Sequence, residues 1–135
     1  RYMLDTNTIA YAKNRRPACV LERLIQHDPS EICISAITMA ELEFGISHSS
    51  RPSQNRKALL MFLSGITILP FGPEAAQAYG EIRHTLQSQG QLIGANDLLI
   101  ASHAKAFGLI LVTHNTREFS RVEGLNIEDW VSTEP

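Results

Sequence analysis

Four acidic side chains stand where their carboxylates could act together: Asp5, Glu41, Asp97 and Glu118. Asp5 directly follows the short apolar run Tyr2–Leu4, and α/β proteins collect functional groups where a strand's carboxyl end leads into a helix. Carboxylates that approach one another closely repel unless a cation lies between them. Because oxygen-only ligands suit Mg²⁺ or Mn²⁺ better than zinc, this chemistry indicates a divalent-metal site.

Both aspartates also have a simpler interpretation as helix caps. Asp5 precedes the helical pattern of Thr8–Asn14, and aspartate is common at such an N-cap. Asp97 opens a strongly apolar helix, where a capping acid is equally ordinary. However, Asp97 shares a helix face with Ile100 and Ala104. An unpaired carboxylate on that apolar stripe needs a cation or hydrogen-bond donors.

The two glutamates are harder to place from periodicity. Glu41 lies on an apolar face of its helix, but Glu43 lies on one in the same way, so the spacing leaves both open. Glu118 follows the last long apolar run, where its carboxylate could also be a solvated acid in the first turn of a helix.

The elements that must position these acids can be read from hydrophobic periodicity. Short apolar runs predict strands at 2–4, 32–34, 66–69, 109–112 and 126–128. Helical spacing predicts helices at 8–14, 17–25, 35–46, 57–63, 73–86 and 97–107, with a polar loop at 47–53. This alternation predicts an α/β fold whose parallel strands are covered on both faces.

Length and composition limit the remaining possibilities. With 135 residues the chain is long enough for one domain with a real core, so residues 1–135 are expected to form a single domain. The net charge of −2 argues against broad electrostatic binding of nucleic acid. No apolar run approaches the roughly 18 residues that a membrane helix needs, and no secretory leader is visible. Cys19 and Cys33 lack metal-type spacing, so we expect reduced thiols in a cytoplasmic protein.

An ordered set of short motifs runs through the chain. They are Leu4–Asn7, Thr38 with Glu41, Leu42 and Gly45, Gly94 with Asp97, and Val112–Phe119. Together they resemble the PIN-domain ribonucleases, and within that family the VapC toxins of bacterial toxin–antitoxin pairs. The ending, with Asn115–Phe119 and then Glu128–Trp130, is similar to the enterobacterial type. The resemblance implies a single PIN-like domain, with a central parallel sheet of four to five short strands sandwiched by helices.

The resemblance also implies roles for the acids. The family glutamate precedes Leu-x-x-Gly, so Glu41 takes that position and Glu43 does not. Asp5 and Asp97 take the positions of the metal-ligating aspartates. Glu118 falls where many members have aspartate, a departure from the family pattern. The resemblance therefore implies a catalytic set of Asp5, Glu41, Asp97 and Glu118.

Three further polar residues match the family pattern: Asn7, Thr113 and Asn115. Asn7 and Thr113 take positions that orient acids or water in the family, although turn and cap roles explain these residue types equally well. Because Asn115 lies near Glu118 in the sequence, the resemblance leaves open which of these two residues takes the fourth site position.

The activity implied by the resemblance is that of a Mg²⁺-dependent endoribonuclease, with Mn²⁺ as a possible substitute. Similar toxins cleave tRNA, and the enterobacterial type is associated with the anticodon stem-loop of initiator tRNA. The implied partners are a cognate VapB-type antitoxin, a second copy in a homodimer, and operator DNA bound through the antitoxin. No membrane association is implied.

Two other functions remain open from the residues. An aspartyl phosphatase also begins with an acid after a strand, but it needs a second aspartate two positions later, where this chain has Asn7. A PIN-like RNA-binding module without catalysis is the other alternative. The presence of Asp5, Glu41 and Asp97 argues against that module.

Overall fold

A five-stranded parallel sheet forms the centre of the protein. The computed structural model describes residues 1–131. The strands are β1 (Tyr2–Leu4), β2 (Ile32–Ser35), β3 (Thr67–Leu69), β4 (Ile110–Val112) and β5 (Ile127–Glu128), in the order β3-β2-β1-β4-β5. Because β1 is central and pairs Leu4 with Val112, the residues that follow β1 and β4 lie side by side at one edge of the sheet.

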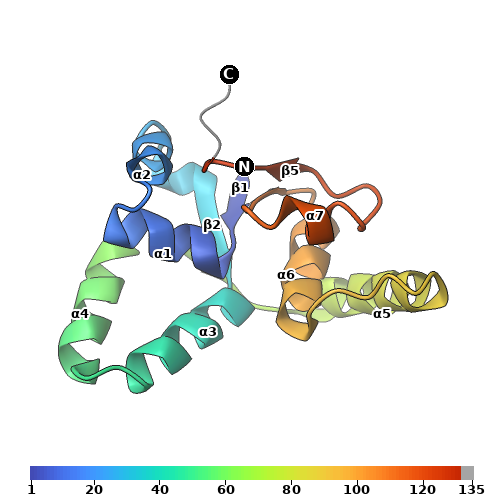
Figure 1. The fold of residues 1–135 in the computed structure, drawn as a ribbon, viewed down its shortest axis with the longest axis horizontal. Helices are drawn as coiled ribbons and strands as arrows, with labels where there is room; N and C mark the ends of the chain where they lie inside the picture. Colours follow the sequence, from blue (N-terminus) through green and yellow to red (C-terminus); the bar gives the residue numbers. More distant parts are fainter. Residues whose placement is uncertain (132–135) are drawn as a thin grey trace.

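Helices cover both faces of this sheet. They are α1 (Thr6–Asn14), α2 (Ala18–Leu24), α3 (Ala36–Ser47), α4 (Pro52–Phe62), α5 (Pro73–Ser88), α6 (Ala95–Ala106) and the short α7 (Thr116–Phe119), with a 3₁₀ turn at Pro29–Glu31. Figure 1 shows α1, α2 and α4 on one side of the strands and α5, α6 and α7 on the other. The predicted sandwich of helices around a parallel sheet is confirmed.

Alternating strand residues divide the core in two. Met3 and Leu111 face a cluster with side chains from α5 and α6, whereas Leu4 and Val112 face a cluster with side chains from α1, α2 and α4. Successive side chains of a strand point to opposite faces, so a strand covered on both sides is apolar at every position. This explains why the strands read as short continuous apolar runs.

The sequence prediction misplaced the start of one helix and missed one short helix. The helix expected at 57–63 begins at Pro52, because proline suits the first helical position, where its missing N–H costs nothing. The short helix α7 was not predicted as an element. Within residues 1–131, no helix combines the length and the hydropathy that crossing a bilayer requires.

Candidate active site

Asp5 is both a helix cap and a buried acid at the carboxyl end of β1. Its carboxylate accepts a hydrogen bond from the Thr8 amide at 2.9 Å, so the capping interpretation of Asp5 is confirmed. Burial raises the pKa of Asp5 and the charge of Glu41 adds to the shift, while hydrogen bonds from Thr113 and Thr8 oppose it. A cap needs only one carboxylate oxygen, which leaves the other available to a further partner.

Asp97 lies in the first turn of α6 and faces the other acids. The N-cap of this helix is Gly94, so the capping interpretation of Asp97 was wrong. Its pKa is raised to about 6, first by burial and then by the charges of Asp5, Glu41 and Glu118, while a hydrogen bond from Asn115 opposes the shift. The raised pKa therefore reports the electrostatic proximity of all four acids.

Glu41 extends from α3 toward the same place, held by two neighbours. The Thr6 hydroxyl donates to one of its carboxylate oxygens, and the Asn96 amide donates to the other at 3.2 Å. Glu43 instead forms an ion pair with Arg56 of α4 at 3.0 Å. The structure thus separates the two glutamates that periodicity left open, and it brings only Glu41 to the other acids.

The segment after β4 supplies the remaining polar groups. Asn115 donates a hydrogen bond to Glu118 at 3.3 Å, and it also contributes the hydrogen bond that lowers the pKa of Asp97. Thr113 is fully buried, and its hydroxyl accepts a hydrogen bond from the Asn115 amide at 3.0 Å. Thr113 therefore stabilises the turn after β4, and its side chain also forms a hydrogen bond with Asp5.

Around the four acids, the structure places two residues that the sequence did not single out, and it leaves one predicted residue without a contact to them. Asn7 is exposed in the first turn of α1, and within residues 1–131 it makes no hydrogen bond to the four acids. Thr6 and Asn96, which hold Glu41, were not singled out from the sequence. Their position next to Asp5 and Asp97 in the chain is the signal that could have identified them.

The donor chemistry of these acids fits a magnesium or manganese ion. All four side chains offer oxygen, and burial together with the charges of the other three acids raises the pKa of Asp97. Within residues 1–131, no three acidic, histidine or cysteine side chains are already gathered into a set that could enclose an ion. Mg²⁺ takes only one or two carboxylates directly and keeps several waters, so an open group of acids suits it.

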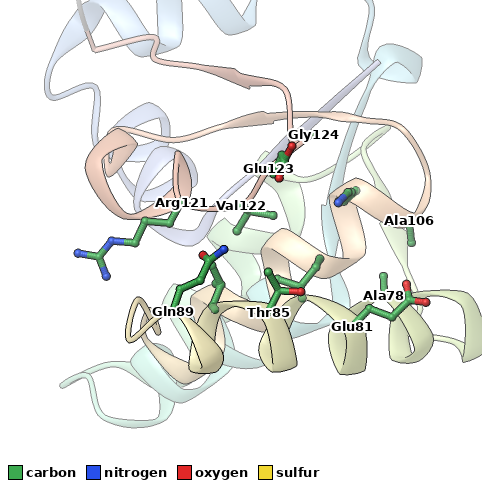
Figure 2. Close-up of a pocket in the computed structure, with 12 residues that line it drawn as sticks. Ala78, Glu81, Thr85, Gln89, Ala106, Arg121, Val122, Glu123 and Gly124 are labelled. Atoms are coloured by element: carbon green, nitrogen blue, oxygen red, sulfur yellow. The ribbon is translucent and has the colours of Figure 1, made fainter.

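Two cavities flank these elements. One of about 580 Å³ lies beside Glu41, and it is lined by Thr6, Glu41 and Asn96 together with apolar side chains of α3 and α6. The other, about 570 Å³, lies between α5, the end of α6 and residues 121–124 (Figure 2). None of the four acids lines the second cavity, and the guanidinium of Arg121 points away from it to the Leu92 carbonyl.

Comparison with known proteins gives a consistent result. The PIN domain family matches residues 2–125. The chain is 47% identical to ribonuclease VapC2 of Haemophilus influenzae, over 97% of this chain and 98% of that protein. It is 42% identical to the tRNA(fMet)-specific endonuclease VapC of Shigella flexneri, over 96% and 98%. In structure it is similar to DNA-bound VapBC from Salmonella typhimurium, with a TM-score of 0.90 and 39% identity, covering 96% of this chain and 98% of that one.

These matches extend over nearly the whole chain and agree with the fold, in which a parallel sheet lies between layers of helices. The resemblance stated from the motifs is confirmed. The chain belongs to the PIN domain family and, within it, to the VapC group.

Proposed function

We propose that this protein is the toxin of a VapBC-type toxin–antitoxin pair and a Mg²⁺-dependent endoribonuclease that cleaves tRNA, with the anticodon stem-loop of initiator tRNA as its substrate. The convergence of four carboxylates beside the carboxyl end of β1 carries the proposal. The names of relatives from Haemophilus influenzae and Shigella flexneri support ribonuclease activity and the tRNA substrate.

Each acid receives a role from its surroundings. Asp5 and Asp97 would hold the ion, because Asp5 is fixed by its cap bond and the pKa of Asp97 is raised by burial and by the charges of the other three acids. When bound, Mg²⁺ supplies positive charge that polarises the scissile phosphate and makes water a better nucleophile. Glu41 and Glu118 would then orient water or further solvent ligands. Asn7 remains a candidate for contacting the substrate because its side chain is exposed.

An exposed aromatic side chain next to the acids suits single-stranded RNA. Phe44 lies one helical turn after Glu41, is 70% exposed and lines the cavity beside the acids. Its ring stacks with His48 at 5.7 Å. Unpaired bases stack on such rings, and RNA sequence is read mainly in loops, where bases can splay out.

Cleavage of an RNA hairpin that carries the initiator anticodon stem-loop tests the proposal. Purified protein should cut the loop with Mg²⁺, cut it with Mn²⁺, and stop when a chelator is added. Hairpin binding without cleavage in any of these conditions would instead support the catalytically inactive RNA-binding module.

The same proposal includes partners. VapBC complexes from Salmonella typhimurium and Rickettsia felis were solved bound to DNA, which supports an antitoxin that binds operator DNA and carries the toxin with it. We expect a homodimer whose antitoxin covers the helices from Ile9 to Ile25 and places an arginine or lysine near Asp5 and Asp97. Ile25 is 72% exposed at the end of α2, where an apolar partner would bury it. The antitoxin's arginine or lysine would pair with the carboxylates of Asp5 and Asp97 in place of the metal.

The antitoxin prediction is tested by co-expression with the product of the adjacent small gene, which should bind this protein and stop RNA cleavage. Ile25→Ser should weaken that complex about tenfold, as removal of one well-buried interface contact does. Leu92→Ser is the matched control, because Leu92 is also exposed but lies in the loop before α6. If the co-expressed product neither binds nor inhibits, the partner proposal fails.

A further inference from the structure

A buried histidine joins the two helices that carry Glu41 and Asp97. His103 lies on α6 and Ser35 ends β2, and both side chains are fully buried. The His103 Nδ1 atom is 2.7 Å from the Ser35 hydroxyl oxygen. Ser35 is also the N-cap of α3, where its hydroxyl oxygen accepts the Ile37 amide hydrogen bond at 3.0 Å.

The direction of this bond follows from the donors available. Burial lowers the pKa of His103, so the ring is neutral at pH 7 and one of its nitrogens is an acceptor. The Ser35 oxygen accepts the Ile37 amide, and within residues 1–131 no acceptor other than Nδ1 is found for the Ser35 hydroxyl hydrogen, so we assign the hydroxyl as the donor to Nδ1. The Nε2 atom has no hydrogen bond of good geometry within residues 1–131, although the Pro70 carbonyl partly opposes the lowered pKa.

This bond and the Asn96–Glu41 bond connect α3 and α6 at two separate levels. Along α3, Glu41 lies six residues after Ser35, and along α6, Asn96 lies seven residues before His103. At 1.5 Å per residue, the two bonds are roughly 10 Å apart on each helix. The helices α3 and α6 therefore run antiparallel, and the two bonds are separated by a similar distance along each helix. One bond is fully buried, while the other lies among the acids.

We propose that His103 is a positioning residue for the metal site: its bond to Ser35 holds α6 against α3 and so sets the spacing of Glu41 and Asp97. The ring is also held in place by an edge contact with Phe71 and a tilted contact with Phe107, at 5.3 and 5.6 Å between centroids. The apolar side chains of α6 pack against α5 and the sheet, so the His103–Ser35 and Asn96–Glu41 bonds are the polar contacts that set the position of α6 relative to α3. This inference rests on the proposed function, because it concerns the binding of the ion by these acids.

Direct titration with Mn²⁺, followed by electron paramagnetic resonance of the free ion, tests this inference without using RNA cleavage. His103→Leu should weaken Mn²⁺ binding roughly tenfold, near the lower end of the losses seen when residues that orient metal ligands are changed. His103→Asn should bind within about twofold of the wild type, because its amide oxygen can still accept the Ser35 hydroxyl.

Ser102→Ala is the matched control. It removes a buried hydroxyl from the same helix, but this hydroxyl bonds only the Leu98 carbonyl of α6. This variant should melt at a lower temperature and bind Mn²⁺ as the wild type does. If His103→Leu does not fold, Ser35→Gly removes the same bond from the other side and should weaken Mn²⁺ binding in the same way, because glycine caps a helix nearly as well as serine and so leaves the start of α3 in place.

The outcomes distinguish the two proposals. Wild-type Mn²⁺ affinity in His103→Leu, or an equal loss in Ser102→Ala, would overturn the positioning role and leave the proposed function standing. If the wild type itself binds no Mn²⁺, the metal-dependent function is overturned and the positioning role falls with it.

Discussion

Asp5→Asn should abolish RNA cleavage and growth inhibition while the protein remains folded. Asparagine caps helices as well as aspartate does, so its side-chain oxygen can still accept the Thr8 amide. The substitution removes the negative charge that would hold the ion, and a loss of roughly 10²–10³-fold or more is expected when a group that stabilises the transition state is removed. The measurement is hairpin cleavage with Mg²⁺, with circular dichroism to establish folding.

Asp28→Asn is the matched control for this substitution. Asp28 also caps a helical turn through its side chain, by accepting the Ser30 amide, but it lies on the surface away from the acids. It should leave cleavage unchanged. Full activity in folded Asp5→Asn protein would reduce Asp5 to a helix cap and remove it from the proposed metal site.

Most of the fold could be predicted from the sequence because the local signals agree with the tertiary structure. Each strand is a short apolar run covered on both faces, and such runs stand out from the amphipathic helices around them. The start of α4 was predicted too late because Ser47–Ser53 is polar, which favours a loop. Pro52 was counted within that loop, although it also suits a helix start.

The site could be predicted only in part, because sequence periodicity does not show which helix face meets which neighbour. Glu41 and Glu43 both lie beside apolar residues, since α3 packs against both core clusters. What separates them is tertiary: Arg56 of α4 pairs with Glu43, and Asn96 of α6 bonds Glu41. Within the sequence, only the family resemblance favoured Glu41 over Glu43. The roles of Asp5, Glu41, Asp97 and Glu118 in catalysis stay predictions.

Asp97→Asn should stabilise the metal-free protein at neutral pH. The pKa of Asp97 is about 6 in the folded protein and near 3.8 when the chain unfolds. Between these values the folded state holds more protons, so this group's contribution to stability is complete below about pH 4 and is lost as pH rises through 6. Asparagine does not titrate, so Asp97→Asn does not lose this stability as the pH rises. Because Asp97 is only partly buried, solvent screening reduces the expected gain to about 1 kcal/mol.

The same variant should also lose most of the stabilisation by Mg²⁺, which is the larger effect. A ligand that binds only the folded state raises the melting temperature, so millimolar Mg²⁺ should stabilise the wild type much more than Asp97→Asn. In metal-free protein the gain is opposed by the lost attraction between the carboxylate and the start of α6, about 0.3–1 kcal/mol, which makes the response to Mg²⁺ the sharper measurement.

Thermal melts of both proteins in chelator and in Mg²⁺, at pH 4.5 and pH 7.5, measure both effects. Equal Mg²⁺ shifts in the two proteins would show that the ion binds elsewhere, because a carboxylate that holds the ion cannot be replaced by an amide without weakening it.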